Sequence, residues 1–220
     1  MRKSGQPLKR SAHLRHLQHP LAKALLCAAL LSSLSGCVGI MVGGAVMGAV
    51  ASADRRTLGA QTEDKSITLK AELRVPKIVG DDAHVNIASF NRKVLLTGEV
   101  KDNATKTLVE REVRAIEGVQ SVANELEIAG PSSYTSRSSD ALVTTKVKAS
   151  LVDMKTISAS SFKVVTERGT VYLMGRVTQR EGQIAADVTR GVSGVQRVVK
   201  IFEYMTEDEL REMSPPKPGL

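Results

Sequence analysis

Hydrophobic positions follow two periods along this chain, and the same succession of periods occurs twice. In the second occurrence, one set is spaced as on a helix, the next alternates as on a strand, and a third is again helical. The three sets are, in order, Val143, Val147, Leu151 and Met154; Phe162, Val164 and Thr166; and Ile184, Ala185, Val188 and Val192. A turn at 167–170 leads into a second strand, VYLMGRV (171–177), and VQRVVKIFEY (195–204) closes the unit.

This pattern predicts a unit of order α-β-β-α-β. The tight turn makes the first two strands antiparallel, and a right-handed helical crossover makes the last strand parallel to the second. Two helices then cover one face of a three-stranded mixed sheet, which is an α+β fold.

Three blocks of the unit recur in the same order, with offsets of 76, 77 and 76 residues. The aligned pairs are DKSITLKAELRV (64–75) with DALVTTKVKASL (140–151), VLLTGEV (94–100) with VYLMGRV (171–177), and GVQSVANELEI (118–128) with GVQRVVKIFEY (194–204). Such a repeat predicts two tandem domains, at 64–129 and 140–205. We expect a turn-rich linker at 130–139, a disordered tail at 206–220, and helix caps at Asp64 and Asp140.

Each repeat carries a glycine at the end of its second strand and another before its last strand. These are Gly98 and Gly118 in the first repeat, and Gly175 and Gly194 in the second. We expect all four to be structural, with the strand glycines relieving crowding before the second helix. Where φ is positive, replacement by Ala should cost about 1 kcal/mol.

The segment before the repeats resembles a lipoprotein export signal. Basic residues end at Lys23, an uncharged apolar run follows, and Leu34-Ser35-Gly36-Cys37 matches the bacterial lipobox. The signal would span 1–36, Cys37 would be acylated, and 37–63 would be a flexible tether. Val38 replaces the Asp that commonly retains lipoproteins in the inner membrane, so the lipobox implies the outer membrane, facing the periplasm.

Two alternatives to this signal stay open. Cys37 could be an ordinary free cysteine, or the uncharged stretch 24–53 could be an uncleaved anchor, since about 20 apolar residues span a bilayer. Glycines within that stretch make a continuous helix unfavourable. If the signal is cleaved, Cys27 is lost with it, and no disulfide or thiol-based metal site is available.

The repeat motifs resemble the BON domain, a small α-β-β-α-β module of bacterial envelope proteins. The shared marks are the strand-Gly-x-Val motif and the Gly-Val that opens the last strand, at Gly98/Val100 and Gly118/Val119, and at Gly175/Val177 and Gly194/Val195. Two such domains behind a lipobox resemble the dual-BON outer-membrane lipoproteins of the DolP type. The resemblance implies a non-enzymatic protein that binds anionic phospholipid, such as phosphatidylglycerol, chiefly through the first helix of its second domain, and that supports outer-membrane integrity.

Charge distinguishes the two repeats. The formal net charge of +8 lies mostly in residues 1–36; residues 64–128 carry −1 and residues 140–205 carry +4. On the helix beginning at Asp140, an outward stripe of small and apolar residues is edged by lysines, which suits shallow insertion among headgroups. Its members are Leu142, Thr145, Lys146, Lys148, Ala149 and Val152. Glu72 replaces Lys148 in the first repeat, so that repeat should bind anionic lipid poorly, and its Leu69 and Leu73 are candidates for packing between the domains.

Other interpretations of the stripe are a solvated basic face, or a contact between domains or between copies of the chain. A related function is that of an adaptor for outer-membrane assembly or cell-division proteins. Relatives can carry Trp at the place of Leu142, and this chain has no Trp, which would make lipid binding weaker or more electrostatic.

Catalytic and nucleic-acid functions find little support in the residues. From Cys37 onward His84 is the one histidine, near Asp81 and Asp82, with no second set of metal ligands. No nucleophile–base pair and no phosphate loop is recognisable. The predicted compartment and the charge of the mature chain argue against nucleic acid. We therefore expect no catalytic residues, no metal and no cofactor.

Overall fold

The computed structural model describes residues 54–81 and 83–213, and these belong to one compact unit, 49–220. The first repeat contains helices α3, α4 and α5 and strands β1 to β4. Their bounds are α3 Leu58–Arg74, α4 Pro76–Val79, β1 His84–Phe90, β2 Lys93–Val100, α5 Asn103–Arg114, β3 Ser121–Asn124 and β4 Glu127–Ile128. β1 pairs antiparallel with β2, and both β3 and β4 pair parallel with β2. The predicted last strand is therefore present in two pieces, interrupted at the buried Leu126.

The second repeat has the same order with an unbroken last strand. Its elements are α6 Tyr134–Asp153, the 3-10 turn η3 Ala159–Ser161, β5 Phe162–Glu167, β6 Thr170–Val177, α7 Gln179–Arg190 and β7 Arg197–Tyr204, followed by α8 Glu207–Met213. β5 pairs antiparallel with β6, and β7 pairs parallel with β6. The α-β-β-α-β order and the mixed sheets predicted from the sequence are confirmed for both repeats.

Three of the predicted boundaries are wrong. Helix α3 begins inside the predicted tether, because the Thr57 hydroxyl accepts from the Ala60 N–H and caps the helix there. Helix α6 begins inside the predicted linker for the same reason, with Ser133 as its cap. The predicted tail contains α8, so 207–213 is helical. Residues 1–53 and 214–220, with the signal, Cys37 and the end of the tail, lie outside the described residues.

Asp64 and Asp140 do not cap helices, since each lies inside its helix and is buried. Each carboxylate instead accepts backbone N–H groups from the hairpin turn of its own repeat. Asp64 accepts from Asn91 and Arg92, and Asp140 accepts from Arg168 and Gly169. All four turn residues have positive φ, a conformation that carboxylate anchoring helps to stabilise. The two aspartates thus tie the first helix of each repeat to its hairpin.

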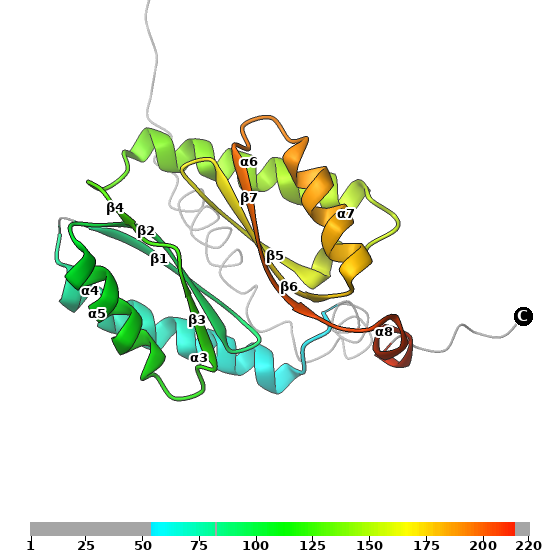
Figure 1. Cartoon of the computed structure of the whole chain (residues 1–220), viewed down its shortest axis with the longest axis horizontal. Helices are drawn as coiled ribbons and strands as arrows, with labels where there is room; N and C mark the ends of the chain where they lie inside the picture. Colours follow the sequence, from blue (N-terminus) through cyan, green and yellow to red (C-terminus); the bar gives the residue numbers. More distant parts are fainter. Residues whose placement is uncertain (1–53, 82, 214–220) are drawn as a thin grey trace, which may run out of the picture. The chain divides into compact units, whose positions relative to one another are not determined.

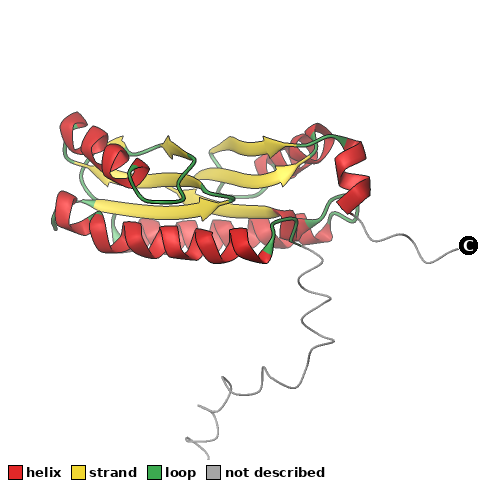
Figure 2. Ribbon diagram, turned by 90° about the horizontal axis from the view of Figure 1, so that it is seen from below, coloured by secondary structure: helices red, strands yellow, loops and turns green. Residues whose placement is uncertain are grey.

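Each sheet is buried on both faces. One face packs under the helices of its own repeat, around Leu96 in the first repeat and Leu173 in the second. The other faces form a third cluster that joins the two repeats, with Phe90 and Leu95 from the first repeat against Tyr172 and Met174 from the second. Figure 1 shows the two sets of strands next to each other with their helices on the outer sides, and in Figure 2 helices lie above and below the strands.

The two strand glycines are crowded in different ways. Gly98 has φ +109°, and a Cβ there would lie 2.0 Å from the backbone oxygen of His84. Gly175 does not have positive φ, but a Cβ there would lie 2.5 Å from the backbone oxygen of Ser161. Gly118 and Gly194 both have positive φ. Close backbone approach is therefore common to both strand positions, whereas backbone strain applies to Gly98.

Candidate functional site

The outward face of α6 is exposed along its length. Its inward face is fixed by Val143, Val147 and Leu151, which are buried in the core of the second repeat. The residues of the stripe are all exposed: Leu142, Thr145, Lys146, Lys148, Ala149 and Val152. Among them are two large apolar side chains, with 64% of Leu142 and 69% of Val152 accessible. The structure therefore brings this stripe together on one solvent-facing surface.

Local contacts hold α6 in this orientation. Asp140 bonds the β5–β6 turn, and the Thr144 hydroxyl donates to that of Thr166 on β5, at 2.7 Å. These contacts occupy the side of the helix that faces the sheet. The opposite side is left for the stripe.

A partly buried lysine of β5 interacts electrostatically with Lys148 of the stripe. Lys163, on β5, donates from Nζ to the backbone oxygen of Ser89, at 3.0 Å. Burial lowers the pKa of Lys163, and the charges of Arg56 and Lys148 lower it further, while Asp64 and Glu72 oppose them. Lys148 therefore lies near enough to Lys163 for their charges to interact.

The corresponding face of α3 also exposes apolar side chains, but an acidic residue stands there in place of Lys148. Leu69 and Leu73 are 58% and 62% exposed, so the expectation that they pack between the domains is wrong. The interdomain contact uses the sheets instead, as described above. Glu72 is exposed on the same face of α3. The acidic residue that distinguishes this repeat is thus at the surface.

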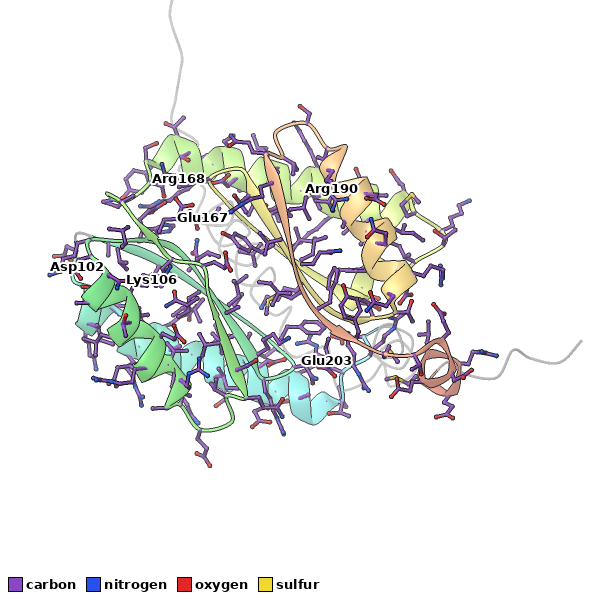
Figure 3. The ribbon with its side chains drawn as sticks, viewed as in Figure 1. Asp102, Lys106, Glu167, Arg168, Arg190 and Glu203 are labelled. Atoms are coloured by element: carbon purple, nitrogen blue, oxygen red, sulfur yellow. The ribbon has the colours of Figure 1, made fainter. Side chains whose placement is uncertain are left out.

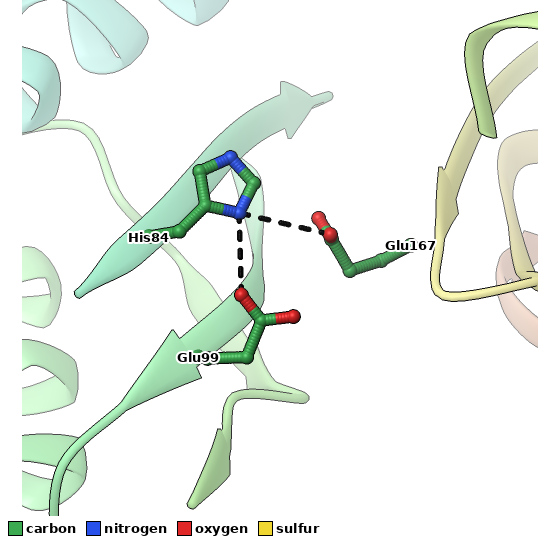
Figure 4. A group of neighbouring side chains, drawn as sticks. All are labelled: His84, Glu99 and Glu167. Carbon is green, nitrogen blue, oxygen red and sulfur yellow. Dashed lines mark ion pairs between the residues drawn. The ribbon is translucent and has the colours of Figure 1, made fainter. Parts of the chain in front are cut away.

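A second group of functional interest, not expected from the sequence, lies between the repeats. His84 of β1, Glu99 of β2 and Glu167 of β5 point toward one another (Figure 4), and their ligand atoms lie within 4.8 Å of each other. His84 Nδ1 is 3.4 Å from Glu99 Oε2 and 3.7 Å from Glu167 Oε1. Glu99 is fully buried, and Glu167 is almost so.

The Glu167 carboxylate of this group lies in an environment that disfavours its charge. Burial raises the pKa of Glu167 to about 7; the hydrogen bond from Asn86 opposes this, and the charges of Glu99 and Asp140 add to it. Burial also lowers the pKa of His84, and the charge of Arg137 acts in the same direction. Of this group the sequence singled out His84 alone, as the one histidine from Cys37 onward, and it pointed to Asp81 and Asp82 as the neighbouring carboxylates. Glu99 and Glu167 stand 68 positions apart in different repeats, and no local pattern pairs them.

Comparison with known proteins supports the same architecture. The BON domain family matches residues 68–130 and 139–205. The chain belongs to the BON-domain family. It carries two copies, as the fold shows, and it resembles DolP-type proteins throughout the repeats.

Three curated relatives share this similarity. The outer membrane lipoprotein DolP of Haemophilus influenzae is 35% identical over 188 residues, which cover 84% of this chain and 97% of the relative. A 21 kDa hemolysin of Actinobacillus pleuropneumoniae is 29% identical over 69% of this chain and 79% of its own length. The osmotically-inducible protein Y of Escherichia coli K12 is 27% identical over 62% of this chain and 70% of its own. Within the described residues, no helix is long and apolar enough to span a bilayer.

Proposed function

We propose that this chain is an outer-membrane lipoprotein, anchored through acylated Cys37 and facing the periplasm, whose second BON domain binds anionic phospholipid and thereby supports outer-membrane integrity. The name of the Haemophilus relative supports the membrane and the anchor. The observation that carries lipid binding is the exposed stripe of α6, in which Leu142 and Val152 are flanked by Lys146 and Lys148.

The energetics of such a surface are modest but sufficient for a tethered protein. A basic residue near an anionic membrane contributes about 1 kcal/mol. Lys146 and Lys148 would supply roughly twice that, and partial burial of Leu142 and Val152 adds about 1 kcal/mol each by apolar transfer. Acylation keeps the domain near the bilayer, so weak contacts act at high effective concentration.

Flotation with liposomes tests this function. Residues 38–220 contain every described residue and all three hydrophobic clusters, so this soluble chain should fold without the anchor. It should float with phosphatidylglycerol vesicles and not with neutral ones. Lys146→Glu/Lys148→Glu should abolish flotation, whereas Lys65→Glu/Lys70→Glu, a matched pair of exposed lysines on α3, should leave it intact.

Absence of flotation at low salt would refute lipid binding by the second domain. The anchor has its own test: Cys37→Ser should release the protein from the membrane fraction. A precursor-sized Cys37→Ser protein that stays in the membrane fraction would instead support an uncleaved anchor.

A second candidate function is that of a non-enzymatic adaptor for outer-membrane assembly or cell-division proteins. The exposed Leu69 and Leu73 on α3 favour it, since paired apolar side chains on a helix surface are typical of a protein contact. Leu69→Glu/Leu73→Glu should then disturb outer-membrane integrity in cells while flotation remains intact.

A further inference from the structure

The buried group between the two repeats has an oxygen that the described residues leave without a hydrogen bond. Glu99 is fully buried, its Oε2 accepts from the Ser132 N–H at 2.9 Å, and its Oε1 has no hydrogen-bond partner. A buried carboxylate oxygen in this state carries a large desolvation cost. A cation that reaches Oε1 as well as Oε2, the oxygen nearer His84 Nδ1, would remove that cost.

The spacing of the group matches metal coordination better than direct hydrogen bonding. The distances of 3.4 and 3.7 Å from His84 Nδ1 to the Glu99 and Glu167 oxygens exceed the usual range for a hydrogen bond. Two ligands at about 2.0–2.2 Å from one tetrahedral zinc ion lie about 3.3–3.6 Å apart. One nitrogen and two carboxylate oxygens could therefore share an ion after small movements.

Neighbouring groups donate hydrogen bonds to both carboxylates, as groups next to the ligands do in established metal sites. Asn86 Nδ2 donates to Glu167 Oε2 at 2.7 Å, which leaves Oε1 on the side of His84. The Ser132 N–H also holds Glu99, but it donates to Oε2, the oxygen that lies nearest His84 Nδ1. The Ser132 hydroxyl lies 3.3 Å from His84 Nδ1 and would have to turn away when that nitrogen binds an ion.

One cation already competes for the group. The Arg168 guanidinium lies 3.8 Å from Glu99 Oε1, too far for a hydrogen bond, and equally 3.8 Å from Glu127 Oε2. Arg168 is about half exposed, and Figure 3 shows it next to Glu167 at the end of the β5–β6 hairpin. It can therefore move toward Glu127 when a metal ion neutralises Glu99.

We propose that His84, Glu99 and Glu167 form a binding site for one divalent transition-metal ion, with zinc the best match to one imidazole and two carboxylates. His84 and Glu99 belong to the first BON domain and Glu167 to the second. The ion would therefore join the two domains next to the apolar contact between their sheets, and its fourth position would be open to water.

Zinc binding to residues 38–220 tests this site cleanly, because that chain contains no cysteine and His84 is its one histidine. The chain is freed of metal with a chelator, dialysed, and titrated with zinc chloride in a calorimeter. One zinc ion per chain should bind, and the thermal unfolding midpoint should rise with zinc concentration by mass action. Glu167→Gln and His84→Gln should each weaken binding by at least about tenfold.

Glu203→Gln is the matched control. Glu203 also lies between the repeats, where its carboxylate accepts from Asn91 and pairs with Arg176, but it is outside the group. The Glu203→Gln variant should bind zinc with the same affinity as the wild type. If His84→Gln does not fold by circular dichroism, the isosteric Glu167→Gln carries the test. Failure of the wild type to bind zinc, or equal binding by wild type and Glu167→Gln, would overturn the proposal, and neither result bears on flotation with anionic vesicles.

Discussion

The anchoring of the hairpin turn by Asp64 is the structural feature whose removal has the most clearly defined cost. The Asp64 carboxylate accepts from Asn91 N and Arg92 N at 2.7 and 2.8 Å, from Ser89 Oγ at 2.6 Å, and from Arg56 at 2.7 Å. In Asp64→Ala the two backbone N–H groups lose their acceptor, at about 1.5 kcal/mol each for bonds to a charged group. The loss of the other two bonds is offset by the relief of burying a charge.

The free energy of unfolding should therefore fall by about 3 kcal/mol in Asp64→Ala. Urea denaturation of residues 38–220 measures it, and the thermal midpoint should fall by roughly 6–12 °C for a chain of this size. Asp81→Ala, at an exposed position of the same repeat, is the control and should change little. A loss below about 1 kcal/mol in Asp64→Ala, or one equal to that of the control, would refute the anchoring role.

Because Asp64 titrates, the difference in stability between the wild type and Asp64→Ala should depend on pH. Burial raises the pKa of Asp64, but the bonds from Ser89, Arg92, Arg56 and Asn91 outweigh it and hold the pKa below 3.8. The folded state therefore binds the proton less tightly than the unfolded state. The stabilisation is fully present above pH 3.8 and is lost as the pH falls through the folded pKa. The gap between wild type and Asp64→Ala should close in that acidic range, and an unchanged gap would contradict this assignment.

Two further substitutions test the packing of the repeats. Gly98→Ala should lower the free energy of unfolding by about 3 kcal/mol or more, because φ is +109° and the new Cβ would meet the backbone oxygen of His84. The control Gly130→Ala has open space around it and should change the free energy by no more than about 0.5 kcal/mol. Equal urea midpoints for the two variants would contradict this prediction. Arg55→Ala should lower the free energy of unfolding by about 2–3 kcal/mol, because the Arg55 guanidinium binds both oxygens of the buried Glu181 at 2.7 Å. A double-mutant cycle with Glu181→Gln should show positive coupling between the two residues. Additive losses of stability would mean that the pair contributes nothing.

Local patterns predicted the elements of this fold because each repeat obeys them. The spacing of Val143, Val147 and Leu151 follows the helical period, and all three are buried as that period requires. The alternation of Phe162, Val164 and Thr166 likewise gave β5. The helix starts were placed too late because Asp64 and Asp140 suit a cap as well as Thr57 and Ser133 do, and only the tertiary contact with the hairpin decides between them.

The contact between the domains could not be predicted, although it left a trace in the sequence. The runs VLL and VYLM are apolar at consecutive positions, which indicates strands buried on both faces, but they do not say what covers the second face. The same limit applies to the interdomain group. Glu99 and Glu167 meet only because the two sheets pack together, and their separation along the chain carries no periodic signal.

Membrane contact by α6 is tested most directly by a single tryptophan, since the chain has none of its own. Leu142→Trp and Leu69→Trp place the probe at similarly exposed positions on α6 and α3, 64% and 58% accessible. With phosphatidylglycerol vesicles, the emission of Leu142→Trp should shift to the blue as the ring enters the interface. The emission of Leu69→Trp should not change. No shift at position 142, or equal shifts at both positions, would contradict lipid binding by the second BON domain.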